Sequence, residues 1–141
     1  MPAVFEQDGI RFLYPENWSL ERGDHDGGWS VTVESNDTAF FTLLYYAEES
    51  DMAALADSAL DTFREEYPLL ESDPALETLA GLPAVGHDVR FISLDLTNTA
   101  WLRALACEVG CVLILCEIND LELEKNGPVL KAMCKSLKVE D

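Results

Sequence analysis

Positive charge is scarce in this sequence and is unevenly placed. The chain has nine lysine and arginine residues against 27 aspartate and glutamate residues, a formal net charge of −18. Residues 1–124 contain five arginines and no lysine, and all four lysines fall within residues 125–141. So acidic a surface repels phosphate groups, and we expect neither nucleic acid nor an anionic membrane as a partner. The acids serve either as a solvated, repulsive surface or as an attraction for a basic partner.

Long hydrophobic runs are absent as well. The longest, Cys111 to Cys116, is far shorter than the roughly 20 residues that span a bilayer. No basic segment precedes an apolar one near the N-terminus, so a secretory signal is not expected. We expect a cytoplasmic protein, and a processed precursor would carry the same sequence. With 141 residues, 48% of them hydrophobic, the chain suits one domain over residues 1–141.

Catalytic and cofactor-binding motifs are also missing. The sequence contains no G-x-G-x-x-G, Walker, G-x-S-x-G or H-E-x-x-H motif, and only two histidines. His25 lies in the turn-like sequence Asp24-His25-Asp26, and His87 lies in a strand pattern. Cys107 and His87 could form a nucleophile and base, but nothing in the sequence brings them together. We therefore predict a protein that is not an enzyme, with no catalytic residues, no metal site and no cofactor.

The four cysteines do not form a recognisable metal-binding pattern. Cys107, Cys111 and Cys116 follow C-x3-C-x4-C spacing, which matches no zinc ribbon or finger, and no histidine lies near them. Cys134 falls on the apolar side of a helical pattern. Buried cysteine behaves as a small hydrophobic residue, so we expect reduced thiols in the core, with a disulfide or a metal site as the alternatives.

Hydrophobic periodicity predicts strands with two helices among them. Apolar residues at i, i+3, i+4 spacing predict a helix from Met52 to Tyr67, capped by Ser50 or Asp51 and ended by Pro68. A second helix is expected over Val129 to Leu137, with Asn119-Asp120 as a cap and Pro128 in the first turn. Strands are expected at residues 4–6, 10–13, 18–22, 29–34, 39–47, 84–95, 97–108 and 111–118, with a less regular extended stretch over 69–79.

This pattern predicts an α+β fold with a mostly antiparallel sheet. The segment Ala39 to Ala47 is aromatic and apolar on both faces, so it should be a central strand covered on both sides. Helices are therefore expected on opposite faces of the sheet. Asp8-Gly9 predicts a tight hairpin near the N-terminus, and Val109-Gly110 predicts another.

Three segments resemble the PsbP-like superfamily. They are the opening F-x-x-x-G-I-R-F-x-Y-P-x-x-W from Phe5 to Trp18, the sequence Thr78 to Ala84, and the closing Met133 to Leu137. That superfamily includes Ran-binding Mog proteins, photosystem II extrinsic subunits and small bacterial proteins. Some of the bacterial members look like Eag chaperones of type VI secretion, dimers that shield apolar helices. The resemblance implies one PsbP-like domain, an α/β/α sandwich, and a chaperone- or adaptor-like protein-binding role, with a homodimer possible.

Phe91, Trp101 and Arg103 are the candidate binding residues, since they lie on adjacent predicted strands. They are either ordinary core residues or part of an apolar sheet surface left open for a partner. Aromatic residues and arginine dominate binding hot spots, so an open surface here would be an interface. The alternative hypothesis is a small-molecule binding protein or an enzyme, with a pocket between the sheet and a helix.

Overall fold

The computed structural model describes residues 2–48, 51–108 and 110–139. The helices are α1 (Met52–Glu66) and α2 (Leu123–Lys135). The strands are β1 (Pro2–Gln7), β2 (Ile10–Pro15), β3 (Ser19–His25), β4 (Gly28–Glu34), β5 (Phe40–Tyr46), β6 (Glu71–Leu79), β7 (Leu82–Ser93), β8 (Leu96–Cys107), β9 (Gly110–Asn119) and β10 (Lys138–Val139). No helix of the described residues is long and apolar enough to cross a membrane.

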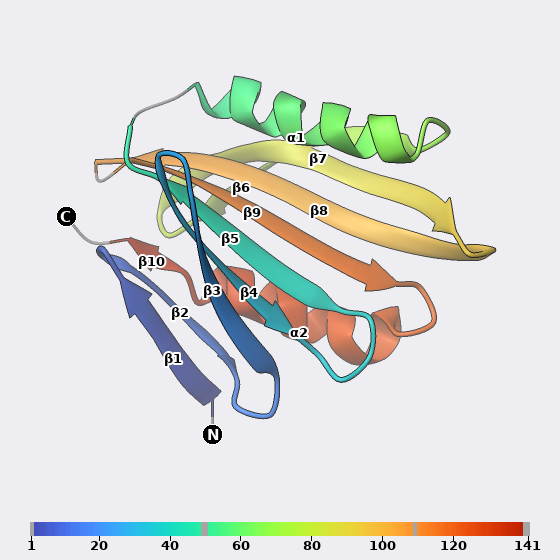
Figure 1. The fold of residues 1–141 in the computed structure, drawn as a ribbon, viewed down its shortest axis with the longest axis horizontal. Coiled ribbons are helices and arrows are strands. Elements are labelled where there is room, and N and C mark those ends of the chain that lie inside the picture. The colour runs from blue at the N-terminus through green and yellow to red at the C-terminus, as the bar shows by residue number, and fades with distance from the viewer. Residues whose placement is uncertain (1, 49–50, 109, 140–141) are drawn as a thin grey trace.

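The strands form two antiparallel sheets. Seven of them pair in the order β3-β4-β5-β9-β8-β7-β6, and the other three in the order β1-β2-β10. Helix α1 covers one face of the large sheet, while α2 and the small sheet cover the other (Figure 1). The predicted α+β fold, with helices on opposite faces of an antiparallel sheet, is confirmed.

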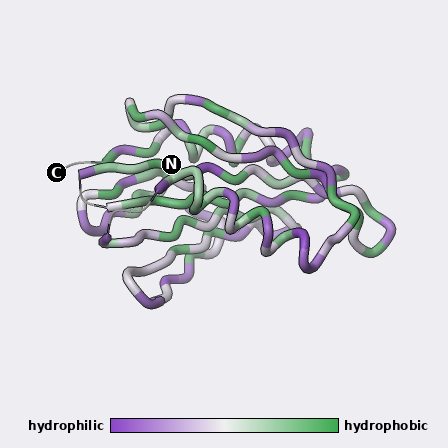
Figure 2. The backbone as a smooth tube through the Cα atoms, turned by 90° about the horizontal axis from the view of Figure 1, so that it is seen from above, coloured by the Kyte–Doolittle hydropathy of each residue, from purple (hydrophilic) through white to green (hydrophobic). Residues whose placement is uncertain are grey.

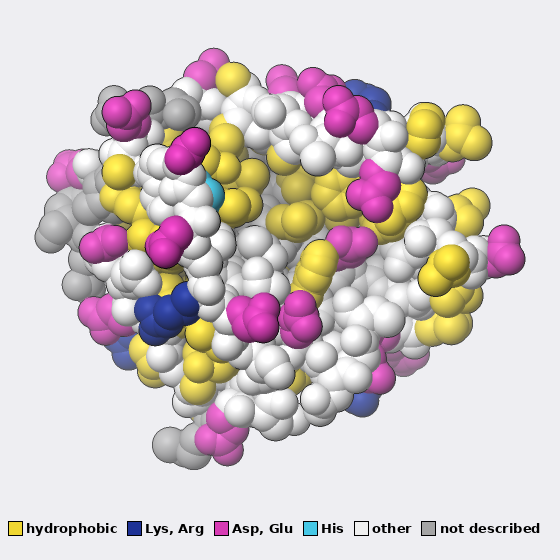
Figure 3. Space-filling view, in the orientation of Figure 1, with side chains coloured by type: hydrophobic (Ala, Val, Ile, Leu, Met, Phe, Trp, Pro, Cys, Tyr) yellow, Lys and Arg dark blue, Asp and Glu magenta, His cyan; other side chains and the backbone are white. Residues whose placement is uncertain are grey.

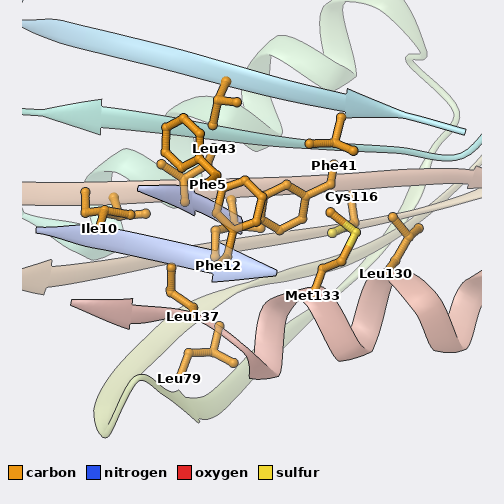
Figure 4. Packing of buried hydrophobic residues seen from close by; sticks show 14 of the residues in the cluster. Phe5, Ile10, Phe12, Phe41, Leu43, Leu79, Cys116, Leu130, Met133 and Leu137 are labelled. Carbon is orange, nitrogen blue, oxygen red and sulfur yellow. The ribbon is translucent and has the colours of Figure 1, made fainter. Parts of the chain in front are cut away.

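The main core lies between the small sheet, α2 and the large sheet. Phe12 of β2 packs on Phe41 of β5, with ring centroids 4.8 Å apart. Met133 and Leu130 of α2 close the same core, as Figure 4 shows. Hydrophobic and hydrophilic residues alternate along much of the backbone, as they do in strands that bury one face (Figure 2).

Two details of the sheets differ from the prediction. The first two strands leave the main sheet and form a separate one with β10, because Phe5, Ile10 and Phe12 all bury their side chains against it. Strand β5 is fully buried on one face only, since α1 lies over β7 and β8. Strand β9 is the most completely buried strand.

The first helix begins as predicted and the second does not. Asp51 caps α1 by accepting a hydrogen bond from the backbone N–H of Ala53 at 3.0 Å. The other predicted cap, Ser50, and the turn residue Val109 lie outside the described residues. Helix α2 is preceded by Glu122, so Pro128 lies inside the helix rather than in its first turn.

Candidate functional site

A cavity of about 260 Å³ lies between the large sheet and α2, and we call it the Trp101 pocket. Strand β8 contributes Trp101 and Arg103, while α2 contributes Lys131, Cys134 and Lys135. The remaining lining residues come from β6, β7 and β9 and are Glu77, Leu79, Asp88, Ile114 and Cys116. Two of the three candidate residues named from the sequence therefore line one pocket.

Arg103 is held in this pocket by internal hydrogen bonds. Its side chain is buried, and it donates to the carboxylates of Glu77 at 2.6 Å and Asp88 at 2.7 Å. A further N–H donates to the carbonyl oxygen of Leu102 at 2.9 Å. Burial alone would lower the pKa of Arg103, but the hydrogen bonds to the two carboxylates raise it, so the guanidinium stays charged. Arg103 therefore shapes the pocket and uses most of its N–H donors within the protein.

The opposite wall of the pocket carries two of the four lysines of the chain. Lys131 lies over the ring of Trp101, with its Nζ atom 5.2 Å from the ring centroid. Lys135 follows one helical turn later and lines the same cavity. Among the described residues no carboxylate lies within salt-bridge distance of either ammonium group. An anion entering this pocket would meet two such lysines.

Two cysteines meet at the floor of the pocket. The sulfur atoms of Cys116, on β9, and Cys134, on α2, are 3.7 Å apart, well beyond the roughly 2.05 Å of a disulfide bond. The hydrogen bond with Cys134 and its own burial raise the pKa of the Cys116 thiol. Each of the four cysteines is a thiol rather than half of a disulfide, with Cys111 and Cys116 buried and the other two partly buried.

Phe91, the third candidate residue, lies on the opposite face of the sheet. It is 4% exposed and packs under α1 against the rings of Tyr67 and Phe63, with centroids 4.3 Å and 5.6 Å away. Phe91 pairs with Asn98 across the β7–β8 hairpin, and directly paired residues share a face. Trp101 and Arg103, at odd-numbered positions on β8, therefore point the other way.

A second candidate surface is the apolar end, defined by the exposed side chains of Leu69, Ile92, Leu94 and Leu96. Leu69 is 95% exposed in the α1–β6 connection, and Leu94 is 93% exposed in the β7–β8 turn. A groove of about 620 Å³ lies beside these residues and extends to Tyr67 and Phe91. Hydrophobic side chains gather at this end of the molecule, at the right of Figure 3.

Leu94 also has an unusual backbone. Its φ is 53° and that of Asp95 is 64°, so both turn residues are left-handed. This is the turn type that joins two strands by two residues, and it favours asparagine, aspartate or glycine at both positions. Leu94 was not identified from the sequence, because it fell inside the predicted strand 84–95, whereas the observed strand ends at Ser93.

Other polar groups of interest have structural partners. His87 contacts Asp57 of α1 at 2.8 Å, and the thiol of Cys107 donates to the carbonyl oxygen of Gly110, so these two residues do not form a nucleophile–base pair. Within residues 2–48, 51–108 and 110–139, no group of three or more histidine, cysteine or acidic residues is placed to hold a metal ion.

Glu122, which was not identified from the sequence either, is a buried carboxylate that accepts several hydrogen bonds. It accepts hydrogen bonds from the backbone N–H groups of Thr38 and Ala39, at 2.7 Å and 3.0 Å, and from side chains of Ser35 and Asn126. Burial would raise its pKa, but these hydrogen bonds outweigh burial and lower it. Its carboxylate ties the β4–β5 loop to the start of α2.

No protein-family model matches the chain, and no curated protein sequence matches it. Solved structures do match in fold. PA94, a protein of unknown function from Pseudomonas aeruginosa, is 11% identical with a TM-score of 0.59, and the match covers 99% of this chain and 98% of PA94. LpqN of Mycobacterium tuberculosis, involved in cell envelope biogenesis, is 12% identical with a TM-score of 0.59, over 100% of this chain and 90% of LpqN.

The cyanobacterial PsbP protein, CyanoP of Synechocystis sp. PCC 6803, is 12% identical with a TM-score of 0.63. That match covers 99% of this chain and 92% of CyanoP. Identities this low establish a shared fold and leave the function open, because one fold carries many functions. None of these three structures bears on the Eag chaperones. The chain has a PsbP-like fold over nearly its whole length.

Proposed function

We propose that the protein is a non-enzymatic binding module that docks an apolar segment of a partner protein on its apolar end. Leu94 is the observation that carries this proposal. It is 93% exposed, and its φ of 53° is a conformation that disfavours a leucine. A left-handed residue with a side chain costs roughly 1–2 kcal/mol, and an exposed leucine recovers none of this by burial. A partner that covers Leu94 would recover it.

The surroundings of the apolar end indicate the chemistry of the partner. Glu66 and Glu71 line the groove beside Arg90, and Asp95 adjoins Leu94 in the turn. The whole chain carries a net charge of −18. A partner segment with apolar residues at its centre would match the apolar groove, and lysine or arginine at its flanks would match the acidic residues at the rim. Shielding such segments is the chaperone- or adaptor-like role that the sequence resemblance implies.

A peptide selection tests this proposal. Random peptides displayed on phage are selected on the immobilised protein, and the affinity of enriched peptides is measured by fluorescence polarisation. We expect an apolar centre with basic flanks. The double variant Ile92→Thr/Leu94→Asn should bind at least tenfold more weakly, about 1.4 kcal/mol. Leu76→Thr is the matched control, since Leu76 is 75% exposed on β6, where it pairs with Val85 rather than with the β7–β8 turn.

Three results would overturn the proposal. Peptides that bind the double variant as tightly as the native protein would place docking elsewhere. An equal loss of affinity in the Leu76→Thr control would indicate that the peptides bind non-specifically to exposed leucines. A dimer in sedimentation equilibrium that dissociates in the double variant would make the occupant of the apolar end a second copy of this chain.

The Trp101 pocket supports a second candidate function, the binding of a small molecule. The pocket lies between the sheet and α2, and polar groups converge on it from three strands and the helix. Such a combination of apolar wall and few placed polar groups is typical of ligand sites, and 260 Å³ is just below their usual size range. The ligand would therefore be smaller than most drug molecules.

A further inference from the structure

The two lysines of the Trp101 pocket have no carboxylate beside them among the described residues, although the chain is strongly acidic. Lys131 and Lys135 are one helical turn apart on α2, so both side chains reach the same cavity. No carboxylate in the described part of the chain lies within 4 Å of either ammonium group, although the chain has 27 acidic residues. Lys125, on the same helix, does lie near a carboxylate, that of Asp37 at 3.7 Å. Two ammonium groups beside a cavity favour an anion there.

The carboxylates of the pocket limit the charge of that anion. Glu77 and Asp88 are both held by Arg103, so their charge is only partly neutralised by one guanidinium. Arg103 also donates to the carbonyl oxygen of Leu102, so it has little capacity left for a ligand. A dianion such as a phosphate ester would meet about twice the repulsion from these two carboxylates that a single carboxylate near the lysines would meet.

The walls of the pocket indicate the rest of the ligand. The half-buried ring of Trp101, with Leu79 and Ile114, provides a flat and apolar lining. Flat rings stack on tryptophan, and a volume of about 260 Å³ admits a small ring system. We infer that the Trp101 pocket binds a small aromatic monocarboxylate, whose carboxylate pairs with Lys131 and Lys135 and whose ring lies against Trp101. This inference rests on the second candidate function, small-molecule binding.

The test uses 1-naphthoate as the probe and uncharged 1-naphthamide as its neutral counterpart. Each is titrated into the full chain while the indole N–H signals of the tryptophans are followed by NMR. Trp101 is the most exposed of the three tryptophans, and Trp18 and Trp29 are buried at 8% and 6% exposure, so they serve as internal references. We expect naphthoate to shift the Trp101 signal selectively and to bind at least tenfold more tightly than naphthamide.

Two double variants with equal net charge complete the experiment. Lys131→Gln/Lys135→Gln should bind naphthoate about tenfold more weakly, and should lose the preference for naphthoate over naphthamide. Lys125→Gln/Lys138→Gln removes the same charge from residues that do not line the pocket, and should bind as the native protein does. A circular dichroism spectrum of each variant confirms that α2 is intact.

Three other outcomes would contradict the inference or the candidate function on which it rests. Equal affinity for naphthoate and naphthamide would overturn the anion preference while leaving small-molecule binding in place. An equal loss of naphthoate affinity in both double variants would show long-range attraction alone and would also overturn the inference. No selective shift of Trp101 with either probe at millimolar concentration would overturn both the inference and the candidate function on which it rests.

Discussion

Leu94 lies in a two-residue turn that asparagine would form with less strain. Because its φ of 53° is unfavourable for leucine and its side chain is 93% exposed, Leu94→Asn should raise the free energy of unfolding. The expected gain is about 1 kcal/mol in urea denaturation. Leu76→Thr should change stability by less, since Leu76 lies in an ordinary extended strand. A loss of stability in Leu94→Asn would mean that the leucine stabilises the fold and is not retained for a partner.

Glu122 makes stability depend on pH. Its folded pKa is lowered, so its stabilising effect is present above the unfolded pKa of about 4.3 and is lost as pH falls through the folded value. Glu122→Gln should lower the free energy of unfolding at pH 7 by about 1–3 kcal/mol, because buried donors lose a charged acceptor. The difference from the native protein should shrink below pH 4. A difference independent of pH would contradict this assignment.

The candidate residues show what sequence could and could not reveal at this scale. Trp101 and Arg103 were identifiable by residue type, and the structure places both in one pocket. Phe91 was grouped with them because the faces of neighbouring strands depend on the turn between them. Predicted strand limits of 95 and 97 differ from the observed Ser93 and Leu96, and a shift of one residue in register exchanges the faces.

At the scale of elements, local signals placed α1 well and α2 less well. Helix α1 has an acidic cap and a regular apolar stripe, both of which are visible in the sequence. Helix α2 begins after Glu122 because that side chain binds the β4–β5 loop, a tertiary contact with no local pattern. Periodicity also shows which face of a strand is buried but not against which sheet, so the separate β1-β2-β10 sheet could not be predicted.

Gly86 lies within β7, opposite Arg103 of β8, where the two backbones approach closely. A Cβ atom at this position would lie 1.7 Å from the carbonyl oxygen of Leu102, and backbone atoms cannot move aside as a side chain does. Gly86→Ala should therefore lower the free energy of unfolding by about 3 kcal/mol or more.

Gly23→Ala is the control for this substitution. Its Cβ atom would meet only the Oγ atom of Ser30, at 3.0 Å, in the edge strand pair β3–β4, and a serine side chain can rotate. We expect a loss below about 1 kcal/mol by urea denaturation. Similar losses in the two variants would show that the close approach of β7 and β8 has no special effect.

At the scale of the whole molecule, the net charge of −18 should make stability depend on salt. Screening weakens repulsion among the acids, so the melting temperature should rise by roughly 5 °C between low salt and 1 M. Sodium and potassium chloride should act equally at the same ionic strength. A melting temperature that does not rise would contradict a self-repelling surface, and a difference between the two salts would indicate binding of one cation.

The similarity to PA94, LpqN and CyanoP extends over the whole chain. It concerns the backbone, whereas function depends on the side chains at the surface. The three structures are only 11–12% identical to this chain, so their side chains differ at most positions while the backbone arrangement is kept. Composition could predict an acidic α+β protein. It could not predict that Lys131 and Lys135 would line one pocket, or that exposed leucines would gather at one end, because both depend on the assembled sheet.

The central claim is that the apolar end receives a partner segment. Its most direct measurement is an NMR titration of the isotope-labelled protein with a peptide enriched in the selection, followed at every backbone amide. The account predicts the largest shifts at Ile92 to Leu96 and at Leu69 and Leu70, with small shifts around Trp101. Shifts centred on the Trp101 pocket, on the edge strands β3 or β6, or on no continuous surface would contradict it.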